Sequence, residues 1–197
     1  CHPFVKYWLH NGFITVNEEK MSKSLGNFFM VIDILEHYEP ETLRFFILST
    51  HYRSPLDFSD ERLAEAQRSL SRLKTAQENL QALMALMNAG PTEESLKLRR
   101  KVLELSNEFM EAMRDDFNTA LAISHMFALA KEINIYHQSI VSVGSKPDGK
   151  LVSILQSVFS EMCSIIGVLE STQGAVEAES CGLEEPLMEM LIAMRQE

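Results

Sequence analysis

From residue 59 onward, apolar residues recur at steps of three and four, a spacing that a long α-helix gathers onto one face. The first series is Leu63, Ala66, Leu70, Leu73, Leu80, Met84 and Met87, with only Gln77 out of pattern. Such a seam is typical of a helix that packs nearly antiparallel to a neighbour. Ser59 is a suitable N-cap before it, and Gly90-Pro91 marks its end.

Three more helical patterns follow, at about 92–113, 119–143 and 151–169. Thr92 is expected to cap the first of them, and either Asp116 or Asn118 the second. The second pattern is apolar on two sides and should form the most buried helix. The predicted stripes of the other two are Leu98, Val102, Leu105, Phe109 and Met113, and Leu151, Leu155, Val158, Met162, Ile165 and Leu169. Four amphipathic helices with short connections predict an antiparallel, up-and-down bundle.

The first 58 residues read differently. Phe13–Val16 is the best strand candidate, and the turn signal Asn11-Gly12 precedes it. Residues 4–9 indicate a short helix or the tail of one, and residues 33–38 another. Pro40 suits the first turn of a further helix that runs to Ser49. We therefore expect a mainly α chain, in which a segment with one or two short strands precedes the bundle.

A cationic loop follows the predicted strand, with Lys20 and Lys23 among small hydroxyl residues. Lysine is a compact charge on a long stem, and the hydroxyls of Ser22 and Ser24 are able to donate to phosphate oxygens. Phosphoryl and nucleotidyl transfer require positive charge where negative charge accumulates in the transition state. The pattern is typical of a loop that closes on a polyphosphate, although an isolated K-x-x-K is more often an exposed turn.

Residues 20–28, which read K-M-S-K-S-L-G-N-F, resemble the lysine signature of class I aminoacyl-tRNA synthetases, in the form found in the cysteinyl enzymes. Three other strings resemble the same family: E-T-L-R at 41–44, similar to its D-A-L-R signature, H-Y-R-S at 51–54, and D-D-F-N-T at 115–119. The resemblance implies the C-terminal end of a class I, Rossmann-type catalytic domain followed by a helical bundle of the anticodon-binding type. It implies three parts: residues 1–57, 58–169 and 170–197, the last a linker and the start of a further helical element.

The family's activity is the ATP-dependent activation of cysteine to cysteinyl-adenylate and its transfer to tRNA(Cys). The resemblance thus implies L-cysteine, tRNA(Cys) and ATP with Mg²⁺ as partners. The ATP-binding residues it implies are Lys20, Met21, Ser22, Lys23 and Ser24, with Lys20 and Lys23 contacting the phosphates in the transition state. Arg44 and Arg53 are candidate contacts to the tRNA backbone.

Other signatures of the family have no counterpart in this sequence. The H-I-G-H string is missing, and Cys1 and His2 do not stand at the spacing of the family's zinc ligands. We therefore expect no metal ligands in this chain, with Zn²⁺ belonging to the full-length enzyme. The chain is expected to be a C-terminal fragment that is inactive alone.

Composition limits the possible partners and compartment. The net charge of −10 argues against broad, non-specific nucleic-acid binding but leaves room for a local basic patch, such as residues 97–101. The three cysteines are dispersed, as is usual in a reducing cytosol, and Cys163 is expected to be a small core residue. No apolar run is long enough to span a bilayer. We therefore expect a cytoplasmic monomer without a membrane partner.

Two alternatives remain open at this point. A cysteine-adenylating ligase that acts on an amino-sugar acceptor would share the lysine signature and an H-Y-R-S-like string. A non-catalytic helical module would instead use the seam between Leu63 and Met87 for an intermolecular coiled coil.

Overall fold

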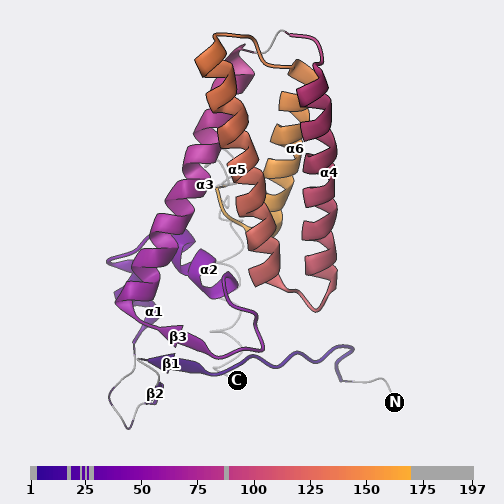
Figure 1. The fold of residues 1–197 in the computed structure, drawn as a ribbon. Coiled ribbons are helices and arrows are strands. Elements are labelled where there is room, and N and C mark those ends of the chain that lie inside the picture. Colours follow the sequence, from indigo (N-terminus) through magenta and orange to yellow (C-terminus); the bar gives the residue numbers. More distant parts are fainter. Residues whose placement is uncertain are drawn as a thin grey trace, which may run out of the picture.

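The computed structural model describes residues 4–16, 19–22, 24, 26, 29–86 and 89–169. Four long helices stand side by side as a bundle, and a small sheet and two short helices lie at one end of it (Figure 1). This mainly α architecture agrees with the sequence-based prediction. The elements are β1 (Ile14–Val16), β2 (Glu19–Lys20), α1 (Val31–Leu35), α2 (Pro40–Leu48), β3 (Leu56–Phe58), α3 (Asp60–Leu86), α4 (Glu93–Arg114), α5 (Thr119–Val143) and α6 (Gly149–Ile166).

Side-chain caps fix where the long helices begin. Thr92 forms a capping box with Ser95 at the start of α4, because its Oγ1 accepts from the Ser95 amide at 3.1 Å and its own amide donates back to Ser95 Oγ. Asn118, one of the two predicted caps, accepts from the Leu121 amide at the start of α5. Asp148 caps α6 through the amides of Lys150 and Leu151. The predicted starts of α4 and α5 are therefore confirmed, whereas the helix predicted at 151–169 begins at Gly149 and ends at Ile166.

The seam of α3 is buried as predicted at Leu63, Ala66, Leu70, Leu73 and Leu80. Ala76 and Leu83 are also fully buried, whereas Met84, a predicted seam residue, is 37% exposed. α3 contacts α2, α5 and α6, so three neighbouring helices rather than one determine which of its residues are buried. Met87 lies outside the described residues. Neighbours within the chain cover the seam, so it is not available for an intermolecular coiled coil.

Burial in the bundle core confirms the predicted apolar stripe of α4. Two predictions, one for α5 and one for α6, were wrong. The most buried helix is α6, with eight of its 18 residues buried against seven of 25 in α5. The end of α5 is exposed because it extends past its neighbours, so that Val143 is 77% accessible. In α6, Ile166 rather than Ile165 faces the core. This helix is as long and apolar as a membrane span, but core helices of bundles meet the same criterion, and its apolar face packs inside the bundle.

The small sheet has the order β2-β1-β3. β1 pairs antiparallel with β2, and parallel with β3 in a register that sets Ile14 opposite Leu56 and Val16 opposite Phe58. The described part of the chain thus has three strands, one more than expected. β3 falls on the boundary expected between the first two parts. A three-residue strand that contains an aspartate shows no clear alternation in sequence, which is why β3 was not predicted.

Two predictions for the first 58 residues were wrong. Residues 4–9 form no helix, and their large apolar side chains are exposed, with Phe4 at 95% and Trp8 at 70%. A helix this short is stable only if tertiary packing holds it, and the described residues supply no such packing. The predicted helix at 33–38 is α1, which begins two residues earlier and ends at Leu35. α2 begins at Pro40, as predicted.

Candidate functional site

The lysine loop, residues 19–26, begins at the edge of the small sheet. Lys20 belongs to β2, and its Nζ lies 4.9 Å from the centre of the Phe13 ring, a cation–π contact. The next residue, Met21, donates its amide to the Ile14 carbonyl at 3.3 Å and packs its side chain against the core. The beginning of the loop is therefore anchored to β1, while its polar residues face solvent.

Three further residues of the loop are described, namely Ser22, Ser24 and Gly26. The hydroxyls of Ser22 and Ser24 lie 2.8 Å apart, and Gly26 has φ +68°, a conformation that glycine adopts without strain. Lys23, the second predicted phosphate contact, lies outside the described residues. The arrangement sets a lysine and two hydroxyls on an exposed turn, where they are able to reach an anion from solvent.

The loop is connected to the segment that leads into the bundle. Thr15 Oγ1 donates to Asp57 Oδ1 at 2.8 Å, which joins β1 to β3. The amide of Gly12 donates to the Tyr52 carbonyl at 2.7 Å, and a Cβ at residue 12 would lie 2.2 Å from the Ser54 carbonyl oxygen. Only glycine allows this approach, so the predicted turn signal marks a contact between two distant segments.

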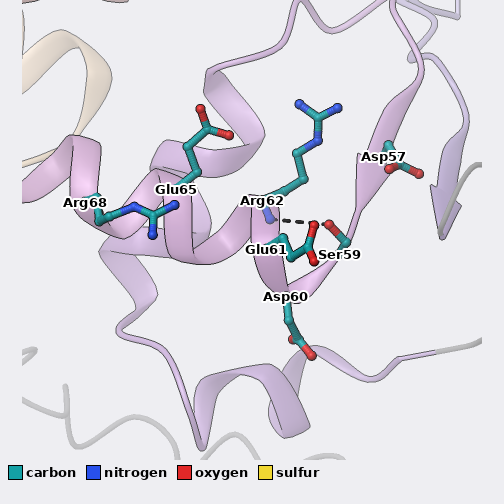
Figure 2. Close-up of a pocket in the computed structure, with 7 residues that line it drawn as sticks. All are labelled: Asp57, Ser59, Asp60, Glu61, Arg62, Glu65 and Arg68. Carbon is teal, nitrogen blue, oxygen red and sulfur yellow. Dashed lines mark hydrogen bonds between the residues drawn. The ribbon is translucent and has the colours of Figure 1, made fainter.

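A surface hollow of about 780 Å³ lies beside β3 at the start of α3 (Figure 2). Its lining residues are Asp57, Ser59, Asp60, Glu61, Arg62, Glu65 and Arg68. Four carboxylates outnumber two guanidinium groups, so the hollow would repel a polyphosphate. It is not the ATP site that the lysine loop implies.

Arg53 holds the linking segment to the turn between α4 and α5. Its Nε lies 2.9 Å from Asp116 Oδ2, and Tyr52 donates its hydroxyl to Asp116 Oδ1 at 2.7 Å. Arg53 also donates to the Tyr52 hydroxyl, and this hydrogen bond, followed by the charge of Asp116, raises the pKa of Arg53. This contact could not be predicted from a local pattern, because Arg53 and Asp116 lie 63 positions apart in the sequence.

The turn that carries Asp116 has an unusual backbone. Asp116 and Phe117 both have positive φ, at 55° and 54°. Residues other than glycine adopt this conformation at a cost that the surrounding structure must offset. Residues 115–119 therefore end one helix and start the next, as predicted, and they also present Asp116 to Arg53.

Arg44 lies at the opposite end of α6 from Asp148. It donates from Nη1 to the Gly167 carbonyl at 2.8 Å, where the end of a helix carries partial negative charge. Glu41 accepts a short hydrogen bond from the Leu169 amide beside it. The charge of an arginine in the apolar helix α2 needs a polar partner, and Arg44 finds it at the C-terminus of α6. The contact of Arg44 with tRNA stays a prediction.

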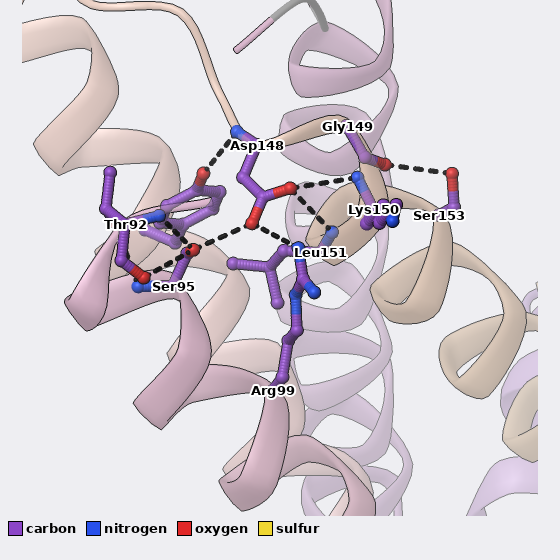
Figure 3. A network of polar contacts seen from close by, with 9 residues as sticks. Thr92, Ser95, Arg99, Asp148, Gly149, Lys150, Leu151 and Ser153 are labelled. Carbon is purple, nitrogen blue, oxygen red and sulfur yellow. Dashed lines mark hydrogen bonds and ion pairs between the residues drawn. The ribbon is translucent and has the colours of Figure 1, made fainter. Parts of the chain in front are cut away.

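Three of the four cations in the basic run at 97–101 lie in ion pairs. Arg99 is mostly buried and pairs with Asp148, which also accepts from Ser95 Oγ (Figure 3). Lys97 pairs with Glu93, and Lys101 with Glu132. Burial of Asp148 would raise its pKa, but the hydrogen bonds from Ser95, from Arg99 and from two amides outweigh it, and the pKa is lowered.

Neither a metal site nor a reactive thiol is indicated among the residues that the structure describes. No three His, Cys, Asp or Glu side chains gather there as they would around a metal ion, and Cys1 and His2 are outside it. Cys163 is buried in α6 as predicted, and burial, with the charge of Glu41, raises its pKa to about 12. Its thiol is therefore protonated and inert at neutral pH.

Comparison with known families agrees with this geometry. Residues 1–68 match the class I (C) tRNA synthetase catalytic domain, and residues 108–170 match the DALR domain. The fold is shared with a solved synthetase, the LeuRS of Agrobacterium radiobacter K84 in its ternary complex with tRNA and LeuAMS, at a TM-score of 0.58 and 18% identity over 81% of this chain and 22% of that one. The family matches thus relate residues 1–68 to a class I synthetase catalytic domain and residues 108–170 to a DALR domain, and the solved structure supports the shared fold.

The similar curated proteins are cysteine–tRNA ligases. The chain is 44% identical to that of Pelotomaculum thermopropionicum over 99% of its own length and 42% of the relative's. It is 43% identical to that of Desulforamulus reducens, with 99% and 42% covered, and 48% identical to that of Syntrophotalea carbinolica, with 85% and 33% covered. The chain therefore spans about two fifths of the length of the first of these relatives.

Proposed function

We propose that the chain is the C-terminal part of a cysteine–tRNA ligase, an enzyme that activates L-cysteine with ATP and transfers the cysteinyl group to tRNA(Cys). The observation that carries the proposal is similarity to these ligases over 99% of the chain. An amino-sugar ligase would have no need of the bundle that makes up most of the described residues.

Within the full enzyme, the lysine loop supplies charge to the ATP phosphates. Lys20 and Lys23 stabilise the transition state, and Met21, Ser22 and Ser24 shape the loop around the nucleotide. Mg²⁺ arrives with ATP and is held largely by phosphate and water, which suits residues 20–26 because they include no carboxylate. The Zn²⁺ that would select cysteine belongs to residues outside this chain.

The bundle, residues 58–169, docks tRNA, and residues 170–197 lead to a further helical element. Arg44 and Arg53 lie where the first 57 residues meet the bundle, and both are exposed enough to contact an RNA backbone. The enzyme acts as a cytoplasmic monomer with no membrane partner.

The test uses cysteine-dependent ATP–pyrophosphate exchange by the full-length enzyme. Lys20→Ala and Lys23→Ala should each lower the rate by about 10²–10³-fold, as loss of one transition-state contact does. Lys146→Ala, in the exposed α5–α6 loop, is the matched control and should leave the rate unchanged. The isolated chain should show no exchange. Exchange by the chain alone, or full activity of both lysine variants, would contradict the proposal.

A further inference from the structure

A hollow between α3 and α5 differs in charge from its surroundings. It has a volume of about 620 Å³ and is formed by Arg72 of α3 and by α5 residues that include Phe127, Lys131, Asn134 and Gln138. Four other hollows on the described surface contain at least one carboxylate, whereas this one is lined by two cations and no acid. In a chain with a net charge of −10, such a place attracts an anion selectively.

The two cations have no acidic partner among the described residues. Some other basic residues of the bundle do have one: Lys74 pairs with Glu39 and Glu41, and Arg114 with Glu111. Glu132, the residue after Lys131, turns towards α4 and pairs with Lys101 at 2.7 Å. The carboxylate closest to Lys131 in sequence is thus already engaged, and the charge of Lys131 is left for a ligand.

Arg72 is held in place without being neutralised. Its guanidinium carbon lies 5.1 Å from the centre of the Phe127 ring, a contact that orients the group and leaves its charge intact. A guanidinium presents a planar fork of donors that matches a phosphate. Arg68 lies one helical turn before Arg72 and has no ion-pair partner among the described residues either.

The hollow also offers uncharged donors. The Asn134 carbonyl accepts from Asn79 Nδ2 at 2.9 Å, so the NH₂ group of Asn134 remains for another partner. Amides beside cations suit a sugar–phosphate chain, which presents phosphate oxygens and ribose hydroxyls in alternation.

We propose that Arg72 and Lys131 form a docking site for the phosphate backbone of tRNA on the α3–α5 face of the bundle. The inference rests on the proposed function and adds the face and the residues through which the bundle holds its RNA. Contacts of this kind position an RNA without reading its sequence. The site should therefore contribute equally to cognate and non-cognate tRNA.

The test measures binding of the 197-residue chain to fluorescently labelled tRNA(Cys) and to a non-cognate tRNA across a series of salt concentrations. The double variant Arg72→Gln with Lys131→Gln should bind both RNAs roughly tenfold more weakly at 0.1 M salt. The slope of log K against log salt should become shallower by about 1.5–2, the value for two lost phosphate contacts. The matched control is Lys146→Gln with Lys150→Gln, which removes the same charge from the exposed end of the bundle and should bind like wild type. Thermal melts verify that both variants fold.

Each outcome decides the matter. If wild type binds tRNA and the double variant keeps its affinity and slope, this docking site is wrong while the proposed function stands. If the control variant loses as much affinity for tRNA as the double variant, the loss reflects overall charge, and the proposed docking site is wrong. If wild type binds neither RNA at any salt concentration, tRNA docking by this chain fails together with the site. If the double variant loses binding to poly-L-glutamate but not to tRNA, the face serves an acidic protein instead.

Discussion

Residues 60–169 and residues 4–58 differ in where they place their apolar side chains. The bundle encloses most of its large ones, and side chains such as Leu73, Leu83 and Met126 have no exposed surface. The first region buries few and exposes many, including Phe4, Tyr7, Trp8, Leu9, Phe13, Ile14, Phe29, Met30, Val31, Ile32 and Leu35. The bundle has the core of a complete structural unit, whereas the first region presents the kind of surface that another part of a protein covers.

The region with the stronger core is therefore not the region that contains the candidate catalytic lysines. The lysine loop lies in the region with the weaker core, and it is joined to the stronger one through α2, β3 and the contact between Arg53 and Asp116. The class I catalytic match covers residues 1–68, and the chain spans about two fifths of its relatives' length.

The largest expected effect tests the core of the bundle. Phe109→Ala removes a ring that is 1% exposed, and it should lower the free energy of unfolding by about 3–5 kcal/mol because a cavity remains. Trp8→Ala, at a side chain that is 70% exposed, should change it by no more than about 0.5 kcal/mol. Urea denaturation of both variants measures the difference. Similar losses would show that residues 4–9 pack far better than their exposure indicates.

The next effect concerns the buried ion pair at the far end of the bundle. Asp148→Asn keeps an N-cap for α6 but leaves Arg99 without its counter-charge. The substitution should lower the free energy of unfolding by about 2–3 kcal/mol. This loss is smaller than for a fully enclosed ion pair, because the Arg99 side chain is 17% exposed. Denaturation at pH 7 measures this loss. Ser153→Ala, on the exposed face of the same helix, serves as the control and should be nearly neutral.

The same pair predicts a dependence on pH. The folded protein lowers the pKa of Asp148, so the stabilisation is complete above the ordinary carboxyl value of 3.8 and is lost as the pH falls towards the lowered value. Melting temperatures between pH 6 and pH 3 should therefore fall more for wild type than for Asp148→Asn. Parallel curves for the two proteins would contradict the assignment.

The bundle was largely predictable because its determinants are local. The three-and-four spacing, the caps Thr92 and Asn118 and the stop at Gly90-Pro91 act within a few residues of each helix end. The errors arose where tertiary contacts choose between adjacent residues, as with Leu83 in place of Met84. The spacing of apolar residues in a sequence does not show which neighbouring helices will cover each of them.

The surroundings of the candidate site were much less predictable. The lysine loop was visible as a motif, but β3, the position of Gly12 against Ser54 and the partner of Arg53 all depend on segments about 40 or more residues apart. The partner of Arg99 was hidden in the same way, and the basic run at 97–101 therefore resembled a patch. Charge in a sequence does not reveal whether it is neutralised.

The third effect tests the weaker region. Gly12→Ala would set a methyl group 2.2 Å from the Ser54 carbonyl, so the two segments must separate at a cost of about 1–3 kcal/mol. Hydrogen–deuterium exchange should rise in β1 and β3 and stay unchanged in α4 and α6. Gly90→Ala, where an added Cβ meets open space, is the control. Protection that is lost evenly through the bundle would show that the two regions unfold as one unit.

The smallest effect concerns the contact that joins the regions. Arg53→Gln removes an exposed ion pair with Asp116, and surface pairs contribute little to global stability, so the melting temperature should stay at the wild-type value. Locally, the segment at 51–54 should lose protection from hydrogen exchange, because Arg53 and Tyr52 hold it to the α4–α5 turn. Arg114→Gln, at an equally exposed arginine that pairs within its own helix, should leave that segment unchanged. If Arg53→Gln instead lowers the melting temperature as much as Asp148→Asn does, the junction is part of the cooperative unit, and the division between the two regions is weaker than their cores indicate.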